Sequence, residues 1–277
     1  MSNIPAPRQG GGGGGSGGGG GRGGEGGGKK RSRGGRGGGR GGRGGSDGPN
    51  GGGHSFHAPN PGNAAQAPGH HVVHVQQSNS ASTVQFASLG LSAPTMRAMN
   101  EVFGYTNATA VQDQTLPPIM KGLDVLARAK TGSGKTIAFL LPSIETLLRS
   151  PPGHQGDVSC LVISPTRELA SQINEEAIKV LKFHNLQSQV VFGGTNIKSE
   201  RNRMSSQRCD FLIATPGRLI DHFESSGLVP KCANLKVLVL DEADQLLEMG
   251  FKPSIDKILS FIPRQRQTLL FSATVPG

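Results

Sequence analysis

The sequence predicts a doubly wound α/β domain, in which helices cover both faces of a parallel sheet. Short, continuous apolar runs recur along the chain after residue 81, and continuous rather than alternating apolar strands are typical of a sheet buried on both faces. The stretches between these runs are long enough to form helices. Strands that alternate with helices pair in parallel through right-handed crossovers, which gives this fold class.

The expected elements follow one another in a regular order. A first helix is expected over 93–103, where apolar residues recur at helical spacing, with Ser92 as a candidate N-cap and Gly104 as its end. A later helix is expected over 167–183, because Leu169, Ile173 and Ala177 lie on one face. Strands are expected at 125–126, 160–163, 189–192, 211–214, 237–240 and 268–271.

Residues 1–80 differ in composition from the rest of the chain. They hold 31 of the 44 glycines, and nine Lys or Arg residues against two acidic ones give them +7 of the net charge of +10. Large apolar residues are almost absent, so this tail cannot bury enough surface to offset the entropy of ordering it. We expect a disordered tail over 1–80 and one domain over 81–277.

The arginines of the tail stand in Arg-Gly-Gly triplets. Guanidinium groups pair with phosphates and stack on bases, while glycines let the backbone follow an irregular single strand. The triplets begin at Arg22, Arg33, Arg36, Arg40 and Arg43. The segment resembles the RGG segments of RNA-binding proteins, and a solubilising low-complexity linker is the alternative.

The composition gives no sign of secretion or of a membrane span. Cys160, Cys209 and Cys232 lie far apart without a CxxC pair, which is typical of a reducing compartment and suggests neither a disulfide nor a zinc site. The chain has no apolar run of about eighteen residues and no signal-peptide pattern. We expect an intracellular monomer in the nucleus or cytoplasm that contacts no membrane. An organelle is not favoured, because the tail is glycine-dominated rather than amphipathic.

A glycine-rich stretch between two apolar segments has the order strand, turn, helix. Gly132 and Gly134 would let several N–H groups point inward, and the following helix N-terminus adds partial positive charge. Lys135 would reach the outer phosphates of a nucleotide and the Thr136 hydroxyl would bind magnesium. The expected phosphate-binding loop consists of Ala129, Lys130, Thr131, Gly132, Ser133, Gly134, Lys135 and Thr136. A glycine-rich turn with an exposed lysine is the alternative.

An acidic pair follows the strand expected at 237–240. Asp241 lies at the carboxyl end of that strand, where open α/β sheets bind ligands, and it could hold magnesium opposite Thr136. Glu242 could orient or deprotonate a water that attacks the terminal phosphate. We expect the strands that carry these two motifs to be neighbours, so that both motifs bind one nucleotide. An acidic helix cap is the alternative for residues 241–244.

Seven motifs in fixed order over residues 86–274 resemble those of the DEAD-box ATP-dependent RNA helicases. Asp241-Glu242-Ala243-Asp244 spells the name of that family, and the phosphate-binding loop precedes it as in the family's first RecA-like domain. The other motifs are a Q motif within 84–112 that contains Phe86 and Gln112, Pro165-Thr166-Arg167-Glu168-Leu169-Ala170, Gly193-Gly194, Thr215-Pro216-Gly217-Arg218 and Ser272-Ala273-Thr274.

The resemblance implies ATP and Mg²⁺ as cofactors, RNA as partner and a role for each motif. Gln112 would read the adenine edge, Tyr105 would pack on the ring, and Phe86, the upstream aromatic residue of the motif, would also belong to the ATP-binding residues. Ser272 and Thr274 would form hydrogen bonds toward Asp244 and couple the nucleotide to the RNA. The RNA backbone would be held by Pro165, Thr166, Arg167, Gly193, Gly194, Thr215, Pro216, Gly217 and Arg218.

The resemblance identifies the chain as the ATP-binding half of an ATP-dependent RNA helicase, with Lys135, Asp241 and Glu242 as catalytic residues. The sequence stops at Gly277, without the family's second RecA-like domain and its arginine finger, so we expect weak ATP binding and slow hydrolysis. One alternative is a catalytically incompetent RNA-binding or partner-competing module driven by the tail. Another is a DNA-directed or unrelated P-loop ATPase.

Overall fold

A parallel sheet organises the part of the chain that the computed structural model describes, residues 72–76, 82–150 and 157–274. Within these residues the sheet has seven strands in the order β1-β2-β7-β6-β3-β5-β4. The strands are β1 (Val72–Gln76), β2 (Asp124–Arg128), β3 (Cys160–Ile163), β4 (Ser188–Val191), β5 (Phe211–Ala214), β6 (Val237–Leu240) and β7 (Gln267–Ser272). The predicted doubly wound α/β fold is therefore confirmed.

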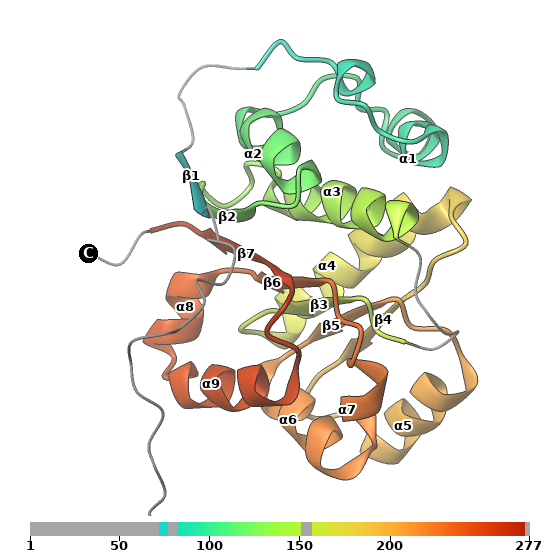
Figure 1. The fold of residues 1–277 in the computed structure, drawn as a ribbon, viewed down its shortest axis with the longest axis vertical. Coiled ribbons are helices and arrows are strands. Elements are labelled where there is room, and N and C mark those ends of the chain that lie inside the picture. The colour runs from blue at the N-terminus through green and yellow to red at the C-terminus, as the bar shows by residue number, and fades with distance from the viewer. Residues whose placement is uncertain (1–71, 77–81, 151–156, 275–277) are drawn as a thin grey trace, which may run out of the picture. The chain divides into compact units, whose positions relative to one another are not determined.

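Helices cover both faces of this sheet (Figure 1). One face is covered by α1 (Ala93–Ala98), α2 (Ala110–Met120), α3 (Lys135–Arg149) and α4 (Arg167–Val180). The other face is covered by α5 (Ile197–Ser206), α6 (Pro216–Ser225), α7 (Leu228–Lys231), α8 (Ala243–Glu248) and α9 (Lys252–Phe261). Short helical turns occupy η1 (Phe86–Ser88), η2 (Met99–Phe103) and η3 (Leu181–Phe183). No helix among the described residues is long and apolar enough to span a bilayer.

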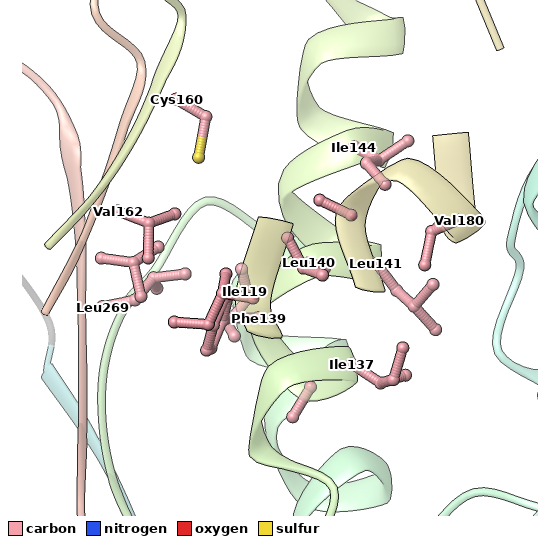
Figure 2. Close-up of a cluster of buried hydrophobic side chains, with 14 of the residues drawn as sticks. Ile119, Ile137, Phe139, Leu140, Leu141, Ile144, Cys160, Val162, Val180 and Leu269 are labelled. Atoms are coloured by element: carbon pink, nitrogen blue, oxygen red, sulfur yellow. The ribbon is translucent and has the colours of Figure 1, made fainter. Parts of the chain in front are cut away.

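Strands β3, β5 and β6 each contribute side chains to two separate hydrophobic cores. On β3, Cys160 and Val162 belong to the core beneath α2, α3 and α4, which Figure 2 shows around Phe139. Leu161 and Ile163 belong to the core on the side of α6 and α9. Successive side chains of a strand point to opposite faces, so burial on both faces requires an unbroken apolar run.

The expected strands are confirmed to within a few residues, and the first helix differs in detail. Residues 93–103 are helical, but the α-helix passes at Met99 into a π-helical turn that Gly104 ends with a φ of 67°. Ser92 stands at the N-cap position without capping the helix through its side chain. Its hydroxyl instead donates to the buried carboxylate of Glu145 at 2.8 Å, which holds α1 against α3.

The expectation of disorder throughout residues 1–80 is wrong for Val72–Gln76, which form the edge strand β1 and pair in parallel with β2. Three of these five residues are valines, and β-branched residues favour extended backbone. The glycine-rich composition of the tail as a whole concealed this short run. The Arg-Gly-Gly triplets lie outside the described residues.

The expectation that the two nucleotide-binding motifs follow neighbouring strands is also wrong. β7 lies between β2 and β6 and pairs with both. The chain leaves β2, builds β3, β4, β5 and β6 on one side, and then returns to fill the gap. The two motifs must therefore meet across the end of β7. A side chain from one motif has to reach past this strand to contact the other motif.

Phe139 of α3 is fully buried and packs edge-on against Phe271 of β7, with ring centroids 5.4 Å apart. We expect Phe139→Ala to lower the free energy of unfolding by about 3–5 kcal/mol, because it removes apolar contacts and leaves a cavity. Denaturant titration measures this loss. Ile178→Ala on the exposed face of α4 is the control and should cost no more than about 0.5 kcal/mol. Equal losses in the two variants would contradict this account of the core.

Candidate functional site

The loop that joins β2 to α3 wraps over the end of the sheet. The backbone N–H of Ala129 donates to the Ser272 carbonyl at 3.0 Å, which ties the loop to β7. Gly134 has a φ of 90°, and a Cβ at this position would lie 2.5 Å from Nε2 of Gln112. Only glycine fits there, because the backbone is left-handed and the side chain of Gln112 fills the space.

Lys135, the first residue of α3, spans the end of β7. Its Nζ lies 2.8 Å from Oε1 of Glu242, which follows β6, and only 7% of the lysine side chain and 13% of the glutamate side chain are exposed. Burying two charges is costly unless they pair closely. The pair therefore fixes the predicted phosphate-binding loop against the acidic motif.

Asp241 presents an unsatisfied carboxylate beside this pair. Burial, reinforced by the neighbouring charge of Glu242, raises the pKa of Asp241 to about 7, although Lys135 acts in the opposite direction. Oδ1 of Asp241 is buried and has no hydrogen-bond partner among the described residues. A divalent cation would satisfy this oxygen and keep the carboxylate ionised, so the residue present fits the expected magnesium ligand.

The backbone at Glu242 is strained. Its φ of 48° is the one positive value at a non-glycine position among the described residues. Such conformations cost about 1–3 kcal/mol, persist only where the surroundings enforce them, and gather at functional sites. The residue with this conformation is the one that pairs with Lys135.

These residues share one cavity of about 640 Å³. Of the residues expected to bind the nucleotide, those that line this cavity are Tyr105, Gln112, Thr131, Gly132, Gly134, Lys135, Thr136, Asp241 and Glu242. Tyr105 is half exposed at the rim, with its ring centroid 5.5 Å from that of Phe103. Ala129, Lys130 and Ser133 belong to the loop but are not among the residues that line the cavity.

Gln112 connects the predicted adenine-binding segment to the phosphate-binding loop. Its Oε1 accepts a hydrogen bond from the Thr109 backbone at 2.8 Å, which completes a capping box at the start of α2. Its Nε2 donates to the Gly134 carbonyl at 3.1 Å. Phe86 does not reach the cavity. Its side chain is fully buried in the core, and its backbone N–H bonds to the Thr106 carbonyl.

One wall of the cavity was not expected from the sequence. It is formed by one face of α4, and the lining residues there are Leu169, Gln172, Ile173, Glu176 and Lys179. Their spacing of three or four residues is the signal that could have identified this face. The apolar members of this set had suggested only packing against the core.

A second cavity, of about 340 Å³, lies where the loops after β3, β4 and β5 meet. It is lined by Pro165, Thr166, Arg167, Glu168, Gly193, Thr215, Gly217, Arg218, Met249 and Phe251. Seven of the nine residues expected to hold RNA therefore meet in one place. Of the other two, Pro216 is buried at the start of α6, and Gly194 is exposed next to Gly193.

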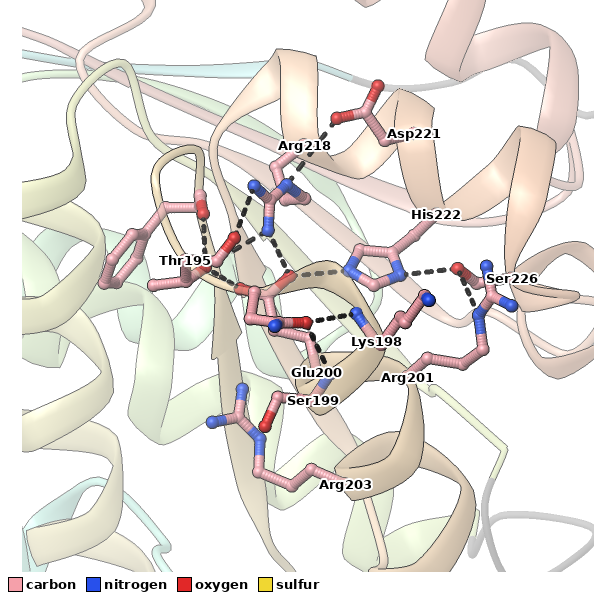
Figure 3. A network of polar contacts seen from close by, with 12 residues as sticks. Thr195, Lys198, Ser199, Glu200, Arg201, Arg203, Arg218, Asp221, His222 and Ser226 are labelled. Carbon is pink, nitrogen blue, oxygen red and sulfur yellow. Dashed lines mark hydrogen bonds and ion pairs between the residues drawn. The ribbon is translucent and has the colours of Figure 1, made fainter.

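Two of these residues also hold the protein together. The Thr166 hydroxyl accepts from the Leu169 backbone at 3.2 Å and caps α4. The Arg218 guanidinium is largely buried and donates to the Thr195 carbonyl at 3.0 Å and to Glu200 at 2.7 Å (Figure 3). The Arg167 guanidinium packs against Gly194, where a Cβ would lie 2.4 Å from its Nη1.

The motif at the end of β7 contacts the acidic motif directly. Both the backbone N–H and the hydroxyl of Thr274 donate to Oδ2 of Asp244 at 2.8 Å. Partial burial acts to raise the pKa of Asp244, but the hydrogen bonds from Thr274 outweigh it and lower this pKa. The Ser272 hydroxyl donates to the Thr274 carbonyl and shapes this turn.

Comparison with known proteins identifies relatives of this chain. A family model described as DEAD/DEAH box helicase matches residues 109–277. DEAD-box ATP-dependent RNA helicase 26 of Arabidopsis thaliana is 50% identical over 210 residues, which cover 73% of this chain and 25% of that protein. The protein of the same name from Oryza sativa subsp. japonica is 53% identical over 200 residues, which cover 70% and 36%.

A solved structure shares the fold. "DEAD-box helicase Mss116 bound to ssRNA and UDP-BeF" is 33% identical with a TM-score of 0.65, over 74% of this chain and 43% of that one. The present chain thus spans about a quarter to two fifths of the length of these relatives. Because the family model matches more than half of the chain, this protein belongs to the DEAD/DEAH box helicase family, and its described residues form the family's amino-terminal RecA-like domain.

Proposed function

We propose that this chain is the ATP-binding half of an ATP-dependent RNA helicase, in which RNA-stimulated ATP hydrolysis is coupled to unwinding or remodelling of RNA. The observation that carries this proposal is the meeting of Lys135, Glu242 and the unsatisfied Asp241 in one cavity. A lysine and two carboxylates at the carboxyl ends of parallel strands form a site for a metal-bound triphosphate.

A bound triphosphate would compete with Glu242 for the ammonium group of Lys135. The ammonium group of Lys135 can move from Glu242 to the outer phosphates, because both partners line the same cavity. Glu242 is then released to orient the attacking water and accept its proton. Asp241 and Thr136 would hold Mg²⁺, which supplies neutralisation of charge on the phosphates.

The second cavity is suited to an RNA backbone. It combines a guanidinium group, threonine hydroxyls and exposed glycine backbone, which are donors for phosphates and sugars but not readers of base sequence. The solved relative Mss116 is itself bound to ssRNA. Asp244, which Thr274 contacts, lies two residues after Glu242, and this contact offers a route by which RNA binding influences hydrolysis.

Single-turnover ATP hydrolysis with the chain in excess tests the function. We expect slow phosphate release that single-stranded RNA accelerates, and we expect Glu242→Gln to reduce the rate at least about 100-fold, because the variant lacks the base. Lys135→Ala should instead weaken nucleotide binding. Glu248→Gln, which changes an exposed glutamate of α8, should have no effect. A chain that binds RNA but never hydrolyses ATP would favour the RNA-binding module over the enzyme.

Base selectivity is a separate question, since the solved relative carries a uridine nucleotide analogue. We expect the chain to bind ATP more tightly than GTP, and Gln112→Ala to weaken ATP binding about tenfold by removing an amide that can both donate and accept. Titration with fluorescent nucleotides measures both affinities. Gln114→Ala, on the same helix but outside the cavity lining, is the control. Equal affinity for ATP and GTP would contradict a role for Gln112 in selecting adenine.

The RNA site can be tested through its salt dependence. We expect Arg167→Ala to weaken binding of single-stranded RNA and to lower the slope of log affinity against log salt by about one, because one phosphate contact is lost. Fluorescence anisotropy at several salt concentrations measures this slope. Arg264→Ala removes the same charge from an exposed position outside this cavity. If both variants behave alike, the second cavity is not the RNA site.

A further inference from the structure

A polar cluster beside the second cavity is centred on a buried carboxylate that the function proposed above does not use. It is centred on Glu200 of α5, whose side chain is only 6% exposed. Figure 3 shows the partners that converge on this carboxylate, which are Thr195, Arg218 and His222. We refer to these four residues as the Glu200 cluster.

Each oxygen of the Glu200 carboxylate has its own partners. Oε1 accepts from the Thr195 hydroxyl. Oε2 accepts from Nη1 of Arg218 at 2.7 Å and contacts Nε2 of the fully buried His222 at 2.8 Å. Because an ionised carboxylate only accepts hydrogen bonds, Nε2 of His222 carries a proton. Burial acts to raise the pKa of Glu200, but these hydrogen bonds outweigh it and lower this pKa.

The cluster joins two loops that belong to different strands. Thr195 directly follows Gly193-Gly194 after β4, and Arg218 directly follows Thr215-Pro216-Gly217 after β5. The guanidinium of Arg218 also donates hydrogen bonds directly to Thr195, to the Thr195 hydroxyl at 3.1 Å and to the Thr195 carbonyl at 3.0 Å. The two loops are thus joined through charged groups that are largely buried.

We propose that Glu200 is a positioning residue, which with His222 holds the loops 193–195 and 215–218 at the spacing that successive phosphates of an RNA strand require. This inference rests on the proposed RNA-binding function and assigns a role to a residue that touches no RNA itself. The cluster orients Arg218 by accepting hydrogen bonds from the guanidinium donors that face the protein interior. The side of the loop 215–218 that faces the cavity is then available to bind RNA.

Whether a substitution of Glu200 weakens or strengthens RNA binding distinguishes the positioning role from an effect of charge alone. Glu200 is negatively charged and lies beside a site proposed for phosphates, so removing its charge would strengthen RNA binding if only charge mattered. Loss of the positioning contacts would weaken RNA binding, because Arg218 and His222 would lose their buried partner and the loops would separate.

The matched control is Asp221 of α6. Its carboxylate lies 3.6 Å from Nε of the same Arg218, but it is 59% exposed and is not among the partners of Glu200. Asp221→Ala therefore removes a negative charge from the same guanidinium without dismantling the Glu200 cluster. A charge effect would appear in both variants, whereas a positioning effect would appear only at Glu200.

The experiment measures the affinity of the full 277-residue chain for a fluorescein-labelled single-stranded oligouridylate by anisotropy. We expect Glu200→Ala to weaken binding about tenfold or more, as loss of charge-assisted hydrogen bonds implies. Glu200→Gln keeps the length and one accepting oxygen, so it should restore most of the affinity. Asp221→Ala should bind as tightly as the wild type or more tightly. Unchanged or stronger binding by Glu200→Ala would overturn the proposal.

Hydrogen exchange without RNA provides a second readout, which does not depend on the proposed function. Glu200→Ala should accelerate exchange of the backbone amides in 193–195 and 217–218, while Asp221→Ala should not. If Glu200→Ala does not fold, the same two measurements are made on His222→Asn. Exchange rates and RNA affinity equal to those of the wild type in that variant would overturn the proposal.

The Arg167→Ala variant separates failure of this proposal from failure of the proposed RNA site. Should Arg167→Ala leave RNA affinity unchanged, the proposed RNA site fails. Should Arg167→Ala weaken binding while Glu200→Ala does not, only the positioning role fails.

Discussion

The ion pair between Lys135 and Glu242 is the contact on which the candidate nucleotide site depends. It joins the first residue of α3 to the turn after β6 across an intervening strand, and both partners are largely removed from water. A buried charge without a partner costs several kcal/mol. The pair therefore keeps the predicted phosphate-binding loop and the acidic motif together, and a triphosphate bound to Lys135 would have to replace the charge of Glu242 with its own.

The two candidate sites are built from the same physical arrangement. Loops at the carboxyl ends of parallel strands carry the polar groups, and β3, β5 and β6 contribute to the apolar core on both faces of the sheet. Buried carboxylates then set the geometry in each site, Glu242 against Lys135 and Glu200 against Arg218. The ligand-binding surfaces are thereby fixed by contacts that lie beneath them rather than by the exposed residues alone.

Much of this arrangement was predictable because the signals are local. Apolar runs gave the positions of the strands, and glycines gave the turn at 132–134, where two positive φ angles are found. Strand order was not predictable, since the place of β7 depends on pairing between segments more than 100 residues apart. Phe86 was assigned to the nucleotide by motif alone, whereas its burial depends on a bridge to residues 106–108. Glu200 carried no signal, because an isolated glutamate on an amphipathic helix is ordinarily solvated.

The central place of β7 affects how the chain is made. β2 and β6 leave the ribosome before residues 267–272 do, so a growing chain presents two unpaired parallel edges on either side of a gap. Unpaired strand edges invite association with other chains. During synthesis the domain is therefore most exposed to misassembly just before its last strand emerges, and the lysine and the glutamate on either side of the gap acquire their native separation only when that strand is inserted.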